Sequence, residues 1–282
     1  MPVCSEWQAI LCKSQSILSS ADRPHFESSP LVLDLSLGIP LYNASRFLDE
    51  LFVCLRGLNP SPREIVFLDD ASSDDSLSRA RQFAKDFLPN VAVRVLSNEH
   101  NLGIAGSYNR LVKETSGEWL QILDADDLFT DTDFYQQIAA HLRAENDVVV
   151  TALRSNKRLL DRCARLVAPL IPLQPPAWLP LLGSVATRAG VLYRRARLVQ
   201  QPFPDPAYAG SDVIHLLELR AGGRCVFLRG PSVRYRIHGA AQSSQLRDYS
   251  IYRQQLVCFD RKTQIAHGLD LHLRQFGQRL IR

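Results

Sequence analysis

Segments of two kinds alternate along the first half of the chain. Short runs of apolar and β-branched residues are each followed by a longer segment whose apolar residues have helical spacing. The expected strands are Leu31–Ile39, Glu64–Leu68, Val91–Leu96, Trp119–Leu123 and Val148–Thr151. The expected helices between them are Ala44–Leu55 (with Asn43 as its N-cap), Asp74–Phe87, Ile104–Glu114 and Asp131–Arg143. This alternation predicts an α/β domain with a mostly parallel sheet and right-handed crossovers.

Several classes of protein are disfavoured by motifs that the sequence lacks. No Gly-x-Gly-x-x-Gly fingerprint follows the first expected strand, which counts against a nicotinamide or flavin enzyme. The net charge of +4 is too small to indicate a nucleic-acid partner. The 6 cysteines are scattered without a Cys-x-x-Cys pair, so neither a zinc site nor a disulfide framework is expected.

The composition is typical of a soluble protein. The 282 residues are 46% hydrophobic and 22% charged, which allows a sizeable core in one large domain or two small ones. The first residues lack the basic start and apolar core of a signal peptide, and no run reaches the ~20 apolar residues of a membrane-spanning helix. A reducing cytoplasm is therefore the expected setting.

The main chemical signal lies where the fourth expected strand ends. Its apolar run, Trp119–Leu123, leads directly into Asp124, Asp126 and Asp127. In an open parallel sheet, ligands bind at the carboxyl ends of the strands. Two carboxylates one residue apart can share a hard divalent cation, which in turn can hold a diphosphate. The alternative is that these acids only form a turn and an N-cap before the Asp131–Arg143 helix.

Six segments, taken together, resemble family-2 glycosyltransferases. They are SLGIPLYN (36–43), IVFLDDASS (65–73), NLGIAGSYN (101–109), SGEWLQILDADD (116–127), Ser211-Asp212 with the later Gly222-Gly223, and Tyr235-Arg236-Ile237-His238 with Ser243 and Ser244. Each is a weak signal alone, but all six follow the family's order between Leu33 and Ser244. The resemblance implies a GT-A fold, in which helices flank a Rossmann-like, mostly parallel sheet. It also implies inverting transfer of a sugar from a nucleotide-diphosphate sugar to a glycan or lipid-linked acceptor.

The resemblance assigns donor-binding roles to six residues. They are Pro40, Tyr42, Asp70, Asn101, Asp124 and Arg236. Tyr42 would pack on the nucleobase, Asp70 would accept a pyrimidine N–H, and Arg236 would pair with phosphate oxygens. Without the resemblance, an Asx-turn that caps the Asp74 helix explains Asp70 equally well.

Asp126 and His238 are the expected ligands of Mg²⁺ or Mn²⁺, again by resemblance. The cation would offset charge that develops on the leaving diphosphate. Read alone, a single histidine after a strand is more often structural than a ligand.

Asp212 is implied as the general base, which would take the proton of the acceptor hydroxyl. Its alternative is the N-cap of a Val213–Leu219 helix. Two departures from the family accompany it. Ser211 stands where the family has glutamate. Tyr108-Asn109 stand where Ala-Arg is usual, or Asn109 keeps only the final Asn, depending on alignment. Arg110 would point elsewhere on a helix, so a phosphate or sugar contact is either missing or supplied differently.

The chain is expected to have three parts. Residues 1–30 form a short helix and a polar linker, and residues 31–245 form the glycosyltransferase domain, with a nucleotide-sugar half (31–150) and an acceptor half (151–245). Residues 246–282 form a helical C-terminal extension. Its apolar face holds Ile265, Leu269, Leu273, Phe276 and Leu280. This amphipathic face is expected to dock on the domain or to lie on a membrane surface.

The acceptor half is unusually basic. Between Arg154 and Arg197 there are 9 basic residues and a single acid, Asp161. Such asymmetry favours an anionic acceptor, for example a glycan on a polyprenyl diphosphate, with peripheral contact at the cytoplasmic membrane face. The alternative is that these arginines line a solvated helix and the nearby prolines pack in the core.

Two other functions share some of these features. A nucleotidyltransferase that makes nucleotide sugars would have a similar sheet and paired acids, but would normally carry a glycine-rich basic loop that SLGIPLYN does not resemble. A non-catalytic relative would keep the fold and lose the acids. Asp124, Asp126 and Asp212 are all present, which favours an enzyme.

Overall fold

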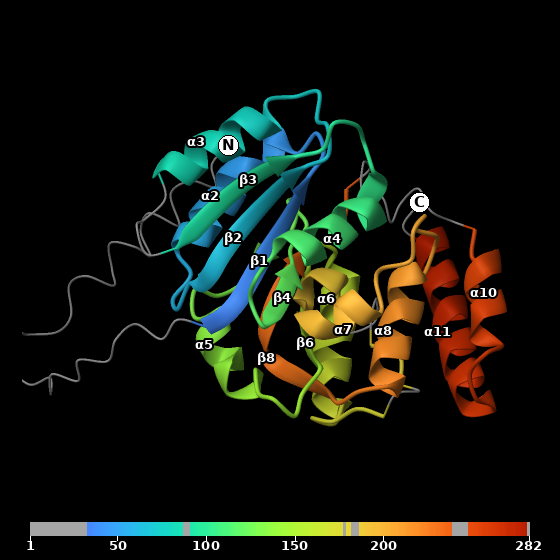
Figure 1. The fold of residues 1–282 in the computed structure, drawn as a ribbon. Coiled ribbons are helices and arrows are strands. Elements are labelled where there is room, and N and C mark those ends of the chain that lie inside the picture. Colours follow the sequence, from blue (N-terminus) through green and yellow to red (C-terminus); the bar gives the residue numbers. More distant parts are fainter. Residues whose placement is uncertain (1–32, 87–90, 177–178, 182–185, 239–247, 281–282) are drawn as a thin grey trace, which may run out of the picture. The chain divides into compact units, whose positions relative to one another are not determined.

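The computed structural model describes residues 33–86, 91–176, 179–181, 186–238 and 248–280 (Figure 1). Side chains are described as far as residue 271. The expected helix and linker of residues 1–30, as well as Ser243 and Ser244, lie outside the described residues. Contacts group Val32–Arg282 into one compact unit.

A single eight-stranded sheet with the order β3-β2-β1-β4-β7-β6-β8-β5 forms the centre of this unit (Figure 1). Its strands are β1 (Leu33–Leu41), β2 (Pro62–Asp69), β3 (Ala92–Ser97), β4 (Trp119–Ile122), β5 (Leu128–Phe129), β6 (Val148–Ser155), β7 (Val191–Arg194) and β8 (Cys225–Tyr235). Strands β3, β2, β1 and β4 are parallel, and so are β6 and β8. Strand β7 runs antiparallel to β4 and β6, and β5 runs antiparallel to β8. The prediction of a mostly parallel α/β sheet is confirmed.

Helices cover both faces of the sheet. They are α2 (Leu48–Arg56), α3 (Ser76–Asp86), α4 (Gly103–Glu114), α5 (Phe134–Ile138), α6 (Arg158–Val167), α7 (Arg195–Gln200), α8 (Ser211–Ala221), α10 (Ser250–Leu256) and α11 (Arg261–Leu280). Side chains of β2 point alternately to the two faces. Ile65 and Phe67 pack in one core cluster with α2, α3 and α5, while Val66 and Leu68 pack in the other with α4 and α8. This two-sided burial explains why the strands are almost continuously apolar.

Some expected helix ends are wrong. The first helix is preceded by a 3₁₀ turn, Ser45–Phe47, and Asn43 does not cap it. Asn43 has a positive φ of 49° and accepts a hydrogen bond from the backbone N–H of Ser73 at 2.9 Å, so it joins the loops after β1 and β2. The expected Asp131–Arg143 helix is only α5 and a following 3₁₀ turn, Ala139–His141.

The C-terminal extension contains the helices α10 and α11, and the described part of its apolar face does not dock on the domain. Ile265 and Leu269 of that face are 56% and 61% exposed, which contradicts the docking alternative, while the membrane alternative stays a prediction; the side chains of Leu273, Phe276 and Leu280 lie outside the described residues. Helix α11 instead buries Thr263, His267 and Leu271, and Leu271 joins the core cluster that contains α8. The apolar spacing therefore identified the helix but not the face by which it docks. Among the described helices, none is both long and apolar enough to cross a bilayer.

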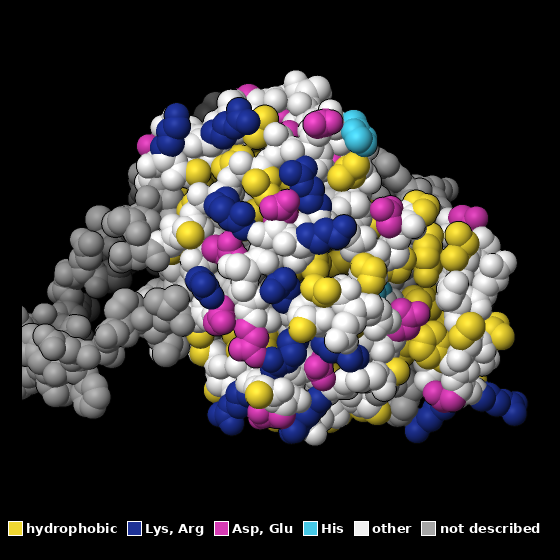
Figure 2. Space-filling view, in the orientation of Figure 1, with side chains coloured by type: hydrophobic (Ala, Val, Ile, Leu, Met, Phe, Trp, Pro, Cys, Tyr) yellow, Lys and Arg dark blue, Asp and Glu magenta, His cyan; other side chains and the backbone are white. Residues whose placement is uncertain are grey.

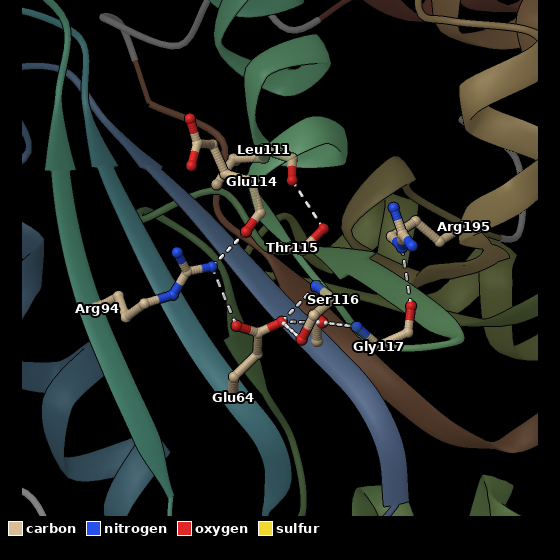
Figure 3. A network of polar contacts seen from close by, with 9 residues as sticks. Glu64, Arg94, Leu111, Glu114, Thr115, Ser116, Gly117 and Arg195 are labelled. Carbon is tan, nitrogen blue, oxygen red and sulfur yellow. Dashed lines mark hydrogen bonds and ion pairs between the residues drawn. The ribbon is translucent and has the colours of Figure 1, made fainter.

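A buried carboxylate ties three strands together at the end of the sheet away from the acids of residues 124–127 (Figure 3). Glu64 of β2 is 4% exposed and accepts hydrogen bonds from the Ser36 hydroxyl of β1 at 2.6 Å and from the Ser116 backbone N–H at 2.6 Å. Arg94 of β3 lies 3.2 Å away. Burial alone would raise the pKa of Glu64, but these hydrogen bonds outweigh it and hold the pKa below its ordinary value of 4.5.

We expect Glu64→Gln to lower the free energy of unfolding by about 2 kcal/mol at pH 7, because it removes charge-assisted hydrogen bonds to a buried group. A depressed folded-state pKa stabilises the protein above the unfolded value and loses that contribution as the pH falls through the folded value. Urea unfolding should therefore show the parent–variant difference in full above pH 4.5 and a shrinking difference below it.

Asp34→Asn is the matched control, since Asp34 forms an ion pair with Arg63 in which both side chains are 53% exposed. Such a surface pair contributes little. A Glu64→Gln difference that is absent at pH 7, or that is unchanged in acid, would contradict this assignment.

Candidate active site

The carboxyl ends of four strands meet at one edge of the sheet. Strands β1, β2 and β4 are parallel to one another. Strand β8 also runs in their direction, because it is parallel to β6, and β6 and β4 are both antiparallel to β7. The residues that follow them are Tyr42, Asp70, Asp124 with Asp126, and Arg236 with His238. The sheet thus places the expected donor and metal residues along one edge, as a parallel α/β site requires.

Asp70 lies at the base of the nucleotide side of this edge. It is 4% exposed, and its Oδ1 accepts hydrogen bonds from the Asn98 side-chain amide and, at 2.8 Å, from the Leu102 backbone N–H. Asp70 does not cap α3, because the backbone N–H of Ser76 bonds instead to Asp74. Asp70 therefore joins the loop after β2 to the start of α4.

Two other expected donor residues are close to solvent. Tyr42 is 57% exposed. Asn101 is exposed, and its side-chain oxygen accepts a hydrogen bond from the Gly103 N–H at 2.8 Å. Gly103 has a φ of +74°, which favours glycine and allows the chain to turn into α4. Pro40 lies within β1, paired with Leu68.

The three acids after β4 have different environments. Both oxygens of Asp124 are engaged, one by the Tyr108 hydroxyl and the other by Arg188 at 2.8 Å. Asp126 lies 2.8 Å from Nε2 of His238. Asp127 is 1% exposed and accepts the backbone N–H of Arg236 at 3.1 Å. None of the three caps the next helix, α5, whose N-cap is Asp133.

Crowding of these carboxylates changes their acidity. Burial, followed by the charge of Asp124, raises the pKa of Asp126, and the contact with His238 opposes that rise. Burial, followed by Asp124 and Asp126, raises the pKa of Asp127 well above its ordinary value. A site in which carboxylates resist ionisation favours the binding of a cation beside them.

Arg236 and His238 reach the acid turn from the end of β8. The Nε of Arg236 donates to the backbone carbonyl of Asp126, and its Nη1 forms an ion pair with Glu50 at 2.7 Å. Its Nη2 is buried and has no hydrogen-bond partner among the described residues. The His238 ring lies 4.9 Å from that of Phe47 and 3.3 Å from an Arg46 nitrogen.

The donor set at this position fits a divalent cation bound partly by substrate. Nε2 of His238 lies 2.8 Å from Oδ2 of Asp126, but no group of three or more His, Cys, Asp or Glu side chains that could hold a metal occurs in the described ranges. Mg²⁺ and similar cations commonly use one or two protein ligands and complete their shell with water and phosphate oxygens. These two residues are therefore a fit for a metal that binds together with a diphosphate.

Asp212 lies at the start of α8. The helix begins at Ser211 and its N-cap is Gly210, so the alternative that Asp212 is the N-cap is wrong. Asp212 and Arg188 line the same small hollow. Its other lining residues are Ile104, Ala105, Tyr108, Phe203, Pro204, Ala207 and Ser211.

Comparison with known proteins agrees with this geometry. The family model "Glycosyl transferase family 2" matches residues 36–198, more than half of the 282 residues. The chain belongs to glycosyltransferase family 2. The prediction made from the six motifs is confirmed at the level of the family and of enzyme class, and this disfavours the nucleotidyltransferase and non-catalytic alternatives.

Individual relatives are distant. The chain is 27% identical over 117 residues to a processive diacylglycerol beta-glycosyltransferase of Mycoplasma pneumoniae, covering 41% of this chain and 34% of the relative. It is 27% identical over 109 residues to the Escherichia coli enzyme WfgD, a UDP-Glc:alpha-D-GlcNAc-diphosphoundecaprenol beta-1,3-glucosyltransferase, covering 39% and 41%. The matched segment thus spans well under half of the length of either relative.

Solved structures support the GT-A fold. S. aureus TarS residues 1–349 with UDP-GlcNAc superimposes with a TM-score of 0.59 at 19% identity, covering 79% of this chain and 65% of TarS. The mannosyltransferase PcManGT of Pyrobaculum calidifontis, in complex with GDP-Man and Mn²⁺, gives 0.58 at 18% identity, covering 88% and 66%. At these identities the likeness concerns the fold alone.

Arg188, Tyr108 and Asn98 belong to this family-2 site but were not predicted as site residues. Arg188 appeared only as one of nine basic residues in the acceptor half. Its guanidinium lies 4.3 Å over the Tyr108 ring and 2.8 Å from Asp124. Burial opposes its charge, but Tyr108, Asp124 and Asp212 hold the pKa of Arg188 well above its usual value.

The departure at Tyr108-Asn109 also has a structural consequence. Asn109 forms two hydrogen bonds with the backbone of Phe203, both of 2.9 Å, and so fixes one wall of the hollow. Arg110 points away toward Ser97 and Asn98, as its helical position predicted. The arginine beside Asp124 comes instead from residue 188, a position with no recognisable motif.

Proposed function

We propose that this family-2 enzyme transfers a sugar, with inversion, from a nucleotide-diphosphate sugar to a glycan or lipid-linked acceptor. One observation carries the proposal: Tyr108 and Arg188, which line a hollow that contains Asp212, both contact Asp124, two residues before Asp126, the partner of His238. This arrangement provides a place for a diphosphate on one side and for a general base on the other. The UDP-GlcNAc and GDP-Man of the structural neighbours support a nucleotide-sugar donor.

Single displacement assigns distinct tasks to these residues. Asp212 would accept the proton of the acceptor hydroxyl while that oxygen forms a bond to the anomeric carbon. The bond from the anomeric carbon to the diphosphate oxygen breaks at the same time, and the nucleoside diphosphate leaves with the electron pair. Attack from the face opposite the leaving group inverts the anomeric configuration.

The other residues would bind the nucleoside diphosphate. Tyr42, two residues after Pro40, would pack on the base. Asp70, whose Oδ1 accepts the side-chain hydrogen bonds that it forms with the described residues, would present Oδ2 to a base N–H. Asn101 would border the nucleotide. The partnerless Nη2 of Arg236 is a donor suited to a phosphate oxygen.

Asp126 and His238 would hold Mg²⁺ or Mn²⁺. When bound, such a cation offsets the negative charge that builds up on the leaving diphosphate. Asp124 would contact the ribose. Its orientation is set by Tyr108 and Arg188, each of which donates to one of its two oxygens. The Mn²⁺ in the PcManGT complex supports this part of the proposal.

The first test is release of nucleoside diphosphate from a panel of nucleotide sugars, with and without metal. We expect at least one donor to be turned over, and excess EDTA to lower the rate by about 100-fold or more, with recovery on adding Mn²⁺. Asp126→Ala should behave like the chelated parent, while Asp133→Ala, a change at an exposed carboxylate, should leave the rate unchanged. Full activity in EDTA would rule out the metal.

The second test concerns the base. Asp212→Asn should keep donor affinity but lower the transfer rate by at least ~100-fold, because the amide cannot accept the hydroxyl proton. Glu218→Gln is the control on the same helix, where the Glu218 side chain accepts a hydrogen bond from Gln201 at 2.8 Å. Transfer at the parent rate by Asp212→Asn would show that Asp212 has no role as a base.

For the acceptor, we propose a lipid-linked molecule at an anionic membrane surface. Exposed apolar side chains form a stripe along α6 and the 3₁₀ turn Ala168–Leu170 that follows it: Leu159, Cys163, Leu166 and Leu170, where the three leucines are 70%, 74% and 78% exposed. A basic stripe, formed by the exposed Arg158, Arg162 and Arg165, runs beside it. In Figure 2, basic and apolar side chains lie close together over the part of this face where Figure 1 labels α6 and α7. Such a helix suits the interface of an anionic bilayer.

Two facts refine this acceptor hypothesis. Arg188, Arg194 and Arg197 are occupied by Asp124, Glu118 and Asp147, so part of the basic excess is internal. The start of α6 is joined to the donor edge by two hydrogen bonds between Asn156 and Ile237, next to His238. A membrane contact through α6 would therefore bring the site close to lipid-linked acceptors.

Vesicle co-sedimentation over a salt series tests the membrane contact. Each exposed basic residue contributes ~1 kcal/mol near an anionic surface, so Arg158/Arg162/Arg165→Gln should weaken binding to anionic vesicles by about tenfold or more. The control Arg63/Arg81/Lys85→Gln removes three exposed charges elsewhere. Equal binding to anionic and neutral vesicles, or no binding by the parent, would leave only a soluble anionic acceptor.

A further inference from the structure

Arg188 contacts Asp124 and also lines the hollow that contains Asp212. Its Nη2 lies 2.8 Å from Oδ2 of Asp124, and the same side chain lines the hollow together with Asp212. The charges of both carboxylates act on it. Arg188 thus contacts Asp124 directly and lies close enough to Asp212 for the two charges to interact.

The surrounding chain holds this arginine in place before any ligand binds. It begins a 3₁₀ turn, Arg188–Gly190, whose carbonyl groups are fixed by buried side chains. Gln121 donates to the Ala189 carbonyl at 2.7 Å, and Thr151 donates to the Gly190 carbonyl at 2.9 Å. The Arg188 guanidinium also packs on the Tyr108 ring, with its Cζ 4.3 Å from the ring centroid. A residue fixed by strands β4 and β6 and by α4 is well placed for specific recognition.

The guanidinium also has an unmet hydrogen-bonding need. Its Nε is buried and has no hydrogen-bond partner among the described residues, although 20% of the side chain is exposed. Leaving a buried donor unpaired is costly, and such groups often mark a place where a ligand binds. A polar ligand in the hollow would supply the acceptor that the protein does not.

Two arginines contact different residues of the acid turn. Arg236 contacts the backbone of Asp126, beside His238, whereas Arg188 contacts Asp124, beside Asp212. If the diphosphate lies at Asp126 and the base acts from Asp212, the transferred sugar must lie between them. That position is next to Arg188 rather than Arg236.

We propose that Arg188 binds the transferred sugar of the donor and, paired with Asp124, selects among donor sugars by their hydroxyl groups. The inference rests on the proposed function. A carboxylate and a guanidinium side by side offer an acceptor and several donors in fixed positions, which suits neighbouring hydroxyls. Tyr108 sets the orientation of both groups, since its ring carries the guanidinium and its hydroxyl donates to Asp124.

Calorimetric binding of a nucleotide sugar and of its nucleoside diphosphate alone tests this assignment. For the donor in a panel of UDP-glucose, UDP-GlcNAc and GDP-mannose that the parent turns over fastest, Arg188→Met should weaken nucleotide-sugar binding by about tenfold or more. Binding of the diphosphate alone should change less than about twofold. The ratio of kcat/KM values between donor sugars should also fall.

Three further variants separate recognition from structural support. Arg188→Lys, which keeps the charge but not the planar donors, should show an intermediate loss and serves as the decisive variant should Arg188→Met not fold. Tyr108→Phe keeps the ring and should reduce donor-sugar discrimination less than Arg188→Met does. Arg63→Met, at an exposed ion pair, should match the parent.

Two results would overturn the proposal. An equal loss of affinity for the diphosphate and for the nucleotide sugar would place Arg188 at the diphosphate. Unchanged affinity for both would mean that Arg188 only neutralises Asp124. Failure of the proposed function itself is different, since the parent would then neither bind nor turn over any donor in the panel.

Discussion

Three carboxylates within four residues at the end of β4 are the constraint on which the site depends. Asp124, Asp126 and Asp127 are held close together, and burial and mutual repulsion raise the pKa values of the last two. The turn stays together because positive or donating groups from distant segments surround it. They are Arg188 from the turn before β7, Tyr108 from α4, and Arg236 and His238 from the end of β8.

The two ends of the sheet differ in what their polar groups do: those at one end hold strands together, and those at the other form the candidate site. The Glu64 network lies at the start of β4 and joins β1, β2 and β3 by buried hydrogen bonds within the protein. At the other end of the same strands the polar groups are only partly satisfied by protein, as the partnerless nitrogens of Arg188 and Arg236 show. Rigid strands between these ends can hold binding groups in position although those groups gain little stability from their own contacts.

The parts of the fold that local pattern controls were predictable from the sequence. Buried strands and their alternation with helices follow from apolar periodicity, and the position of Asp70, Asp124 and Asp126 follows from where strands end. Arg188 was not predictable, because its contact with Asp124 spans 64 residues and nothing in Thr187-Arg188-Ala189 distinguishes it from a surface arginine. The predictions for the Asn43 cap and for the docking face of α11 were wrong for a related reason. In each case, contacts with residues distant in sequence decided between two locally acceptable arrangements.

In the proposed reaction, the acceptor attacks from the side of Asp212 while the diphosphate leaves from the side of Asp126. Proton NMR of the product from the first turnovers tests this directly, because it reports the anomeric configuration. We expect the first product formed to have the anomeric configuration opposite to that of the donor sugar. A product that initially retains the donor's configuration would contradict single displacement and, with it, the assignment of Asp212 as the base.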